Sequence, residues 1–176
     1  LRAEGVEVGV LAVDPTSPFS GGAMLGDRVR MQDHFTDPGV FIRSMGTRGH
    51  PGGLAEATLQ SLLVLDAAGR DVVFLETVGT GQGEVEVVSI ADEVVLVLMP
   101  GSGDSVQALK AGIMEIPDVI AINKMDQPGA KVMLNDIRSV IALDPDAVRR
   151  PAIVFTEAIR EEGVDALWSA LVERRE

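Results

Sequence analysis

Residues 119–126 read VIAINKMD, an apolar run of four residues followed directly by the tetrad Asn123-Lys124-Met125-Asp126. A short run rich in β-branched residues is typical of a strand that is covered on both faces. In a parallel sheet the loops that follow the strands gather at the carboxyl edge, where ligands bind. This stretch therefore predicts a buried parallel strand that carries a polar loop to a ligand site.

The same kind of run recurs along the chain, and segments of helical periodicity separate the runs. Strands are expected at residues 6–13, 40–45, 72–75, 94–99, 119–122 and 152–155. Helices are expected at residues 54–68, 105–115, 131–143 and 164–175, where apolar residues recur every three to four positions. This alternation predicts an α/β fold, with a doubly wound, mostly parallel sheet and helices on both faces, in a single domain over residues 1–176.

Composition excludes several classes of protein. A formal net charge of -12 opposes contact with a nucleic-acid backbone, so we expect no nucleic-acid partner. The chain has no Cys, which excludes disulfides and thiolate metal sites and makes a cytoplasmic location the default expectation. The longest apolar stretch, residues 94–100, is too short to span a bilayer, and no membrane partner is expected.

The tetrad has the donors and acceptors that a guanine base requires. The Asp126 carboxylate can accept two hydrogen bonds from the N1-H and 2-amino edge of guanine, whereas adenine would leave that carboxylate unpaired. The aliphatic stem of Lys124 can cover a ring face, and the Asn123 amide can tie neighbouring loops together. The alternative interpretation is a polar turn after a strand, without a ligand.

A second candidate region, residues 76–83, reads ETVGTGQG and follows the expected strand at 72–75. Glu76 at a strand end can orient a water on Mg²⁺, and Gly79 allows a backbone N–H to approach a terminal phosphate. Asp14 and Asp27 also fit the metal side of a phosphate site. Turn chemistry explains the glycines and Asp14 equally well, and an ion pair explains Asp27.

Several motifs in one order resemble those of the MeaB/ArgK-type GTPases, which are P-loop proteins of the signal-recognition-particle-like class. The residues that carry the resemblance are 13–19 (VDPTSPF), 25–28 (LGDR), 48–49 (RG), 76–82 (ETVGTGQ) and 123–126 (NKMD). The resemblance implies a GTP-hydrolysing chaperone for an adenosylcobalamin-dependent methylmalonyl-CoA mutase. Such a chaperone gates delivery of the cofactor, protects the mutase, uses GTP/GDP with Mg²⁺, and forms a homodimer.

The resemblance also implies roles for individual residues. Around Mg²⁺ and the γ-phosphate these are Asp14, Asp27, Glu76 and Gly79, with Gln82 as a candidate for orienting the attacking water. Asn123, Lys124 and Asp126 would read guanine. Residues 156–158 (TEA) resemble the last loop on the base side, in which Ala158 would direct its backbone N–H toward the guanine carbonyl.

The phosphate-binding motif G-x-x-x-x-G-K-[ST] occurs nowhere in the 176 residues. The opening residues 1–5 (LRAEG) resemble the last turn of a helix closed by a glycine, so we expect a first strand and phosphate loop upstream. On this interpretation the 176 residues alone bind GTP weakly and do not hydrolyse it. Two alternatives stay open: a nickel-enzyme maturation GTPase of the same class, and a non-catalytic module that binds a nucleotide.

Overall fold

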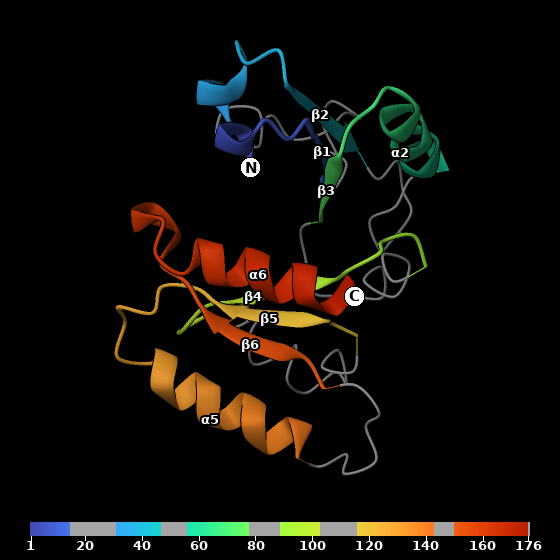
Figure 1. Ribbon diagram of the computed structural model, residues 1–176. Coiled ribbons are helices and arrows are strands. Elements are labelled where there is room, and N and C mark those ends of the chain that lie inside the picture. The colour runs from blue at the N-terminus through green and yellow to red at the C-terminus, as the bar shows by residue number, and fades with distance from the viewer. Residues whose placement is uncertain (15–30, 47–55, 78–88, 103–115, 143–149, 176) are drawn as a thin grey trace. The chain divides into compact units, whose positions relative to one another are not determined.

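The computed structural model describes residues 1–14, 31–46, 56–77, 89–102, 116–142 and 150–175, which are coloured in Figure 1. The chain divides into two compact units, Leu1–Ile90 and Ala91–Glu176. Each unit contains a three-stranded parallel sheet.

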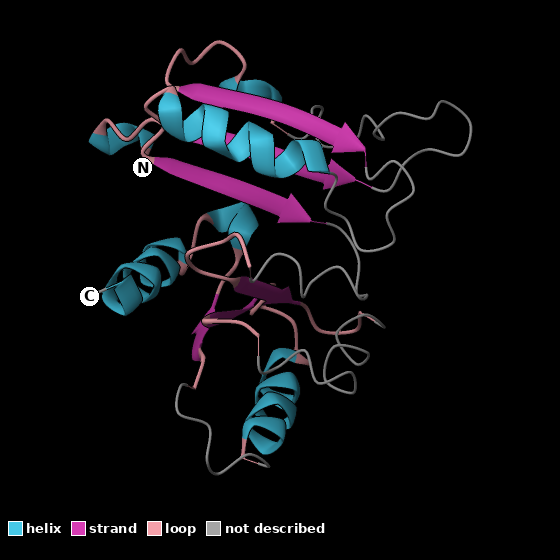
Figure 2. Ribbon diagram, turned by 90° about the vertical axis from the view of Figure 1, so that its right-hand side faces the viewer, coloured by secondary structure: helices cyan, strands magenta, loops and turns pink. Residues whose placement is uncertain are grey.

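The first unit is built on a sheet with the strand order β2-β1-β3. Its strands are β1 (Val8–Asp14), β2 (Val40–Gly46) and β3 (Val72–Thr77), and helix α2 (Glu56–Ala67) lies across one face of this sheet in Figure 2. Gly9 on β1 allows this close packing, because a Cβ atom there would lie 3.1 Å from the Leu65 side chain of α2. The helix therefore rests directly on the backbone of the central strand.

A salt-bridge network surrounds the amino end of β1. The guanidinium of Arg2, in the short 3-10 helix η1 (Arg2–Glu4), donates two hydrogen bonds of 2.9 Å to Asp37. Asp37 lies between η2 (Gln32–His34) and β2. The hydrogen bonds from Arg2, and then that from the Gly39 N–H, lower the pKa of the Asp37 carboxyl below its ordinary value. The network joins the start of the chain to the segment that leads into β2.

The second unit contains β4 (Val95–Leu98), β5 (Val119–Ile122) and β6 (Ala152–Phe155), with β5 in the centre. Helices α5 (Ala130–Ile141) and α6 (Val164–Arg175) cover opposite faces of this sheet, as both views show (Figures 1 and 2). All four residues of β5 are buried, as the apolar run at residues 119–122 predicts. The α5 side of the sheet forms a hydrophobic core of Leu98, Ile120, Ile122, Ala130, Met133 and Ile137.

The expected α/β fold with parallel strands is confirmed, since every strand pairing among the described residues is parallel. The bounds of β5, β6 and α6 match the expected ranges, and the other described strands and α-helices differ from theirs by one or two residues at one or both ends. The six described strands form one three-stranded sheet in each unit. The expectation that all strands belong to one continuous sheet stays a prediction.

Two further expectations concern the chain start and the helix at 105–115. Gly5 has a φ of 82° and closes η1, as expected for a left-handed glycine at the end of a helical turn. The helix expected at 105–115 lies outside the described residues. In the part of the chain that the structure describes, no helix combines the length and apolar character needed to cross a membrane.

Candidate functional site

The loop that carries the Asn-Lys-Met-Asp tetrad is anchored on both sides of β5. The Asn123 N–H donates to the carbonyl oxygen of Leu98, at the end of β4, over 2.8 Å. On the other side, the Met125 N–H donates to the Thr156 carbonyl, directly after β6, over 3.1 Å. The tetrad therefore continues the hydrogen-bonding of the sheet for three residues beyond the end of β5.

A side-chain interaction joins this loop to the one that follows β6. The Asn123 side-chain oxygen accepts hydrogen bonds from the Thr156 hydroxyl at 3.2 Å and from the Ala158 backbone N–H at 3.1 Å. Thr156 is buried, with 5% of its surface exposed. The prediction that the Asn123 amide ties neighbouring loops together is confirmed by these two bonds.

The remaining polar residues of the tetrad face outward from this anchored backbone. Lys124 has a φ of 57°, in the left-handed region that a long side chain seldom adopts, and such conformations cluster at functional sites. The Gln127 N–H donates to the Lys124 carbonyl over 3.0 Å and closes the turn. The side chains of Lys124 and Asp126 are exposed, so both remain available to a ligand.

The loop after β6 is closed on itself. The Glu157 N–H donates to the Glu162 carbonyl over 2.9 Å, and the 3-10 helix η4 (Ala158–Arg160) lies between them. Gly163 completes the closure with a φ of 77°, at a position where an added Cβ would collide with the backbone of Phe155. The Ala158 N–H is therefore held in a defined place, although its partner here is Asn123 and its predicted role toward a guanine carbonyl stays a prediction.

The sequence analysis assigned no individual role to two residues that shape this site, Thr156 and Gly163. The hydroxyl of Thr156 donates a hydrogen bond to the Asn123 side chain. The left-handed backbone of Gly163 lies against the backbone of Phe155. A Thr at the start of a polar loop that follows a strand is too common a pattern to reveal such a role. The signal that could have singled out Gly163 is its position directly before the apolar start of α6, where a glycine often permits a special backbone angle.

The predicted phosphate and metal side is described only in part. Glu76 lies in β3 and pairs in register with Ala12 of β1, so Asp14 lies two residues further along the neighbouring strand. Both strands thus end close together at one edge of their sheet. Asp27, Gly79 and Gln82 lie outside the described residues. Among the residues that the structure describes, no group of three or more His, Cys, Asp or Glu could hold a metal ion, so the predicted Mg²⁺ ligands stay a prediction.

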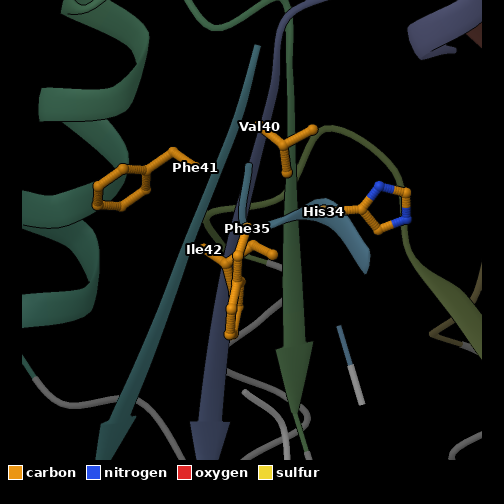
Figure 3. A pocket seen from close by; sticks show the side chains of 5 residues that line it. All are labelled: His34, Phe35, Val40, Phe41 and Ile42. Atoms are coloured by element: carbon orange, nitrogen blue, oxygen red, sulfur yellow. The ribbon is translucent and has the colours of Figure 1, made fainter. Parts of the chain in front are cut away.

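A hollow in the first unit is lined by His34, Phe35, Val40, Phe41 and Ile42. In Figure 3, Phe41 lies on the α2 side of β2 and Val40 lies on the other side, as the alternation of a strand requires. The lining is apolar apart from His34 and includes none of the candidate residues. It lacks the convergent polar groups that mark a ligand site.

Comparison with known proteins adds to this geometry. A family model described as "Methylmalonyl Co-A mutase-associated GTPase MeaB" matches residues 1–176. A Pyrococcus abyssi protein classed as a GTPase is 55% identical, covering 99% of this chain and 55% of the relative. The GTPase ArgK of Escherichia coli is 37% identical, over 98% of this chain and 54% of that protein. The mouse "methylmalonic aciduria type A homolog, mitochondrial" is 34% identical, over 98% of this chain and 43% of that protein.

Solved structures show a similar fold at low sequence identity. The hydrogenase maturation factor HypB of Archaeoglobus fulgidus has a TM-score of 0.66 and 16% identity, and the match covers 99% of this chain and 79% of that one. The fold is therefore similar to that of HypB. The chain spans about half the length of the Pyrococcus and Escherichia coli relatives, at 55% and 54%.

Proposed function

Because this chain belongs to the MeaB family of methylmalonyl-CoA mutase-associated GTPases, we propose that it supplies the guanine-recognising part of a GTP-hydrolysing chaperone. Its client would be an adenosylcobalamin-dependent methylmalonyl-CoA mutase. The chaperone would gate delivery of the cofactor and protect the mutase from inactivation. The single observation that carries the nucleotide assignment is the Asn123 side chain, which joins the tetrad to the loop after β6.

The arrangement of the tetrad supports guanine as the base. The side-chain oxygen of Asn123 accepts two hydrogen bonds from the loop after β6, so Asn123 positions the two loops. Asp126 is exposed, and its carboxylate is available to bind the base. A carboxylate accepts but does not donate hydrogen bonds, and it therefore complements the N1-H and 2-amino group of guanine. The stem of the exposed Lys124 offers an apolar surface to the ring.

Hydrolysis would depend on positioning and charge neutralisation at the phosphate side of the site. Mg²⁺, when bound, would neutralise charge on the β- and γ-phosphate oxygens. It prefers carboxylate and water oxygens as ligands, and Glu76 at the end of β3 offers that chemistry. We assign Asp14 and Asp27 to the same group, Gly79 to the γ-phosphate contact, and Gln82 to orientation of the attacking water.

The partner and the cellular setting are proposals for the whole protein. The family name supports association with methylmalonyl-CoA mutase. We propose a cytoplasmic homodimer, with no nucleic acid and no membrane among its partners. The likeness to HypB concerns the fold alone, and the two His and absent Cys of this sequence give nickel few of its usual ligands.

The test uses the full-length protein together with purified adenosylcobalamin-dependent methylmalonyl-CoA mutase. Phosphate release from Mg-GTP is measured for the protein alone and with the mutase, and co-elution of the two is measured with GDP and with a non-hydrolysable GTP analogue. We expect slow hydrolysis that the mutase accelerates, and co-elution that depends on the nucleotide. GTP binding without phosphate release would identify a non-catalytic module. Hydrolysis that the mutase leaves unchanged, with no co-elution, would refute the partner.

A further inference from the structure

Helix α2 carries apolar residues on the side that faces away from its sheet. Leu65 lies on the inward side and is buried, whereas Leu63 and Val64 are 61% and 66% exposed, and Leu59 is also exposed. Figure 2 shows this outward side toward the viewer, and no other described element of the first unit covers it. The four consecutive apolar residues 62–65 therefore wrap around the helix instead of following one stripe.

Helix α5 shows the contrasting pattern of a helix whose outward side faces water. Its exposed residues are Lys131, Val132, Asn135, Asp136, Arg138 and Ser139, and five of these six are polar. The exposed residues described for α2 are Ala57, Leu59, Gln60, Leu63, Val64, Asp66 and Ala67, and only two of these seven are polar. A helix that is apolar on all sides is normally buried on all sides. The sequence of α2 is thus typical of a helix that is covered on two sides.

The outward residues of α2 form two neighbouring ridges with a spacing of four residues. One ridge consists of Leu59, Leu63 and Ala67, and the next consists of Gln60, Val64 and Ala68. The groove between two such ridges accepts a ridge of side chains from a second helix. Neither ridge carries a charge, and the alanines at the end of each allow the two helices to approach closely. The surface therefore fits the apolar face of another helix.

We infer that the outward face of α2 packs against a helix of the same polypeptide, from the part of the full-length protein that lies outside these 176 residues. The matched region covers 55% of the Pyrococcus abyssi relative and 54% of the Escherichia coli relative. A chain of that length has enough further residues to supply the covering helix. This inference goes beyond the proposed function and does not depend on nucleotide binding.

The size of the face favours a segment of the same chain over a second copy. A helix of 12 residues is about 18 Å long and about 10 Å wide, so one side of it offers on the order of 200 Å². A stable interface between two proteins takes about 800 Å² from each partner. A segment of the same chain needs less area, because it does not give up the freedom of a separate molecule.

Cysteine labelling of the full-length protein tests whether the face is covered. Val132 on α5 is the matched control, because it is 61% exposed, as Leu63 is. Each residue is replaced by Cys in turn, maleimide labelling of the parent is subtracted, and rates are divided by those of the unfolded protein. We expect Leu63→Cys to react at least about tenfold more slowly than Val132→Cys, since a covered thiol reacts only when the cover opens.

Glutamine substitutions at the same two positions give a readout of stability. Gln forms helices well and is uncharged, so helix propensity and the helix dipole affect the two variants little. Leu63→Gln should lower the melting temperature of the full-length protein by several degrees, because a covered amide loses its hydration. Val132→Gln should leave the melting temperature unchanged.

A photo-reactive amino acid in place of Leu63 identifies what covers the face. We expect a cross-link to a peptide outside residues 1–176, in a product that keeps the mass of one chain on a denaturing gel. A product with the mass of two chains would make a second copy the occupant, and a cross-link within residues 1–176 would assign the cover to this part of the chain. Either result would overturn the inference, and so would equal labelling rates for Leu63→Cys and Val132→Cys.

Discussion

The Thr156 hydroxyl lies 3.2 Å from the Asn123 side-chain oxygen, the same acceptor that receives the Ala158 N–H. One amide oxygen thus joins the loops that follow two neighbouring strands, β5 and β6. Removal of either donor would leave that oxygen with half of its partners in the described part of the structure.

Thr156→Val tests this junction, because it replaces a buried hydroxyl by a methyl of similar volume. We expect the free energy of unfolding to fall by about 1 kcal/mol, the usual contribution of one hydrogen bond. GDP binding by the full-length protein should weaken as well, since Asn123 and Ala158 lose a shared anchor. Thr156→Ser retains the hydroxyl and is the control. Equal GDP affinity for the Val and Ser variants, measured by calorimetry, would show that the junction serves stability alone.

Asp126→Asn tests base recognition in the full-length protein. An amide can donate to the 2-oxo group of xanthine, so we expect the preference to move from GTP toward XTP. GTP affinity should fall on the order of a hundredfold, since hydrogen bonds to a charged group are among the stronger ones. Asp136→Asn, on the exposed side of α5, removes the same charge elsewhere and should leave the preference unchanged. A competition assay measures both, and an unaltered preference in Asp126→Asn would remove this residue from the site.

Glu76→Ala separates the phosphate side of the site from the base side. If Glu76 organises Mg²⁺, the rate of GTP hydrolysis should fall at least tenfold while GDP affinity changes much less, because the γ-phosphate is absent from GDP. Single-turnover phosphate release and GDP titration give the two quantities. Glu7→Ala, at the opposite end of the strands and paired with Arg70, is the control for loss of a carboxylate. An equal loss of both quantities would assign Glu76 a structural role.

Gly163→Ala tests the closure of the loop that presents Ala158. A left-handed backbone costs a non-glycine residue about 1 kcal/mol, and here the added methyl also collides with the backbone of Phe155. Gly69→Ala is the matched control, because Gly69 has a φ of 78° and open space around its Cα. We expect the Gly163 variant to lose more stability in thermal unfolding than the Gly69 variant. Similar losses would mean that the collision is relieved by a small shift of the loop.

The Arg2–Asp37 pair predicts a dependence of stability on pH. The pKa of Asp37 is lowered in the folded protein, by the hydrogen bonds from Arg2 and then by that from the Gly39 N–H. Its contribution is therefore complete above the ordinary carboxyl pKa and is lost as the pH falls through the lowered value. Melting temperatures of the parent and of Asp37→Asn should differ at neutral pH and converge in acid. Asp33→Asn, an exposed carboxylate of the same segment, should track the parent at every pH.

Local sequence patterns were sufficient for most of the described elements and for those parts of the candidate site that one segment supplies. The run at 119–122 predicts β5 because a strand buried on both faces needs apolar residues at every position. The role of Asn123 followed from the chemistry of an amide at the end of a strand. The roles of Thr156 and Gly163 could not be predicted in this way. The Thr156 hydroxyl acts through Asn123, which is distant in sequence. The left-handed conformation of Gly163 matters because its Cα lies against the backbone of Phe155, a contact that only the folded chain shows.

The arrangement of the sheet was less predictable. Hydrophobic periodicity indicates that a segment is a strand but does not say which strand lies beside it, since pairing depends on tertiary contacts. The sequence therefore did not predict the order of the strands, that is, which strands would be hydrogen-bonded neighbours. The Mg²⁺ ligands posed a different difficulty, because Asp14, Asp27 and Glu76 are spread over more than sixty residues and their convergence depends on loops rather than on strands.

The pairing of β4, β5 and β6 sets limits on how this protein can change in length. Val95, Val119 and Ala152 lie side by side, and so do Leu98, Ile122 and Phe155, so the three strands begin and end together. Insertion of one residue into β5 would turn every following side chain to the opposite face and would move Asn123 out of reach of Thr156. Relatives should therefore tolerate insertions and deletions in the connections that enter these strands, and very few between residue 119 and the Asn that ends the run.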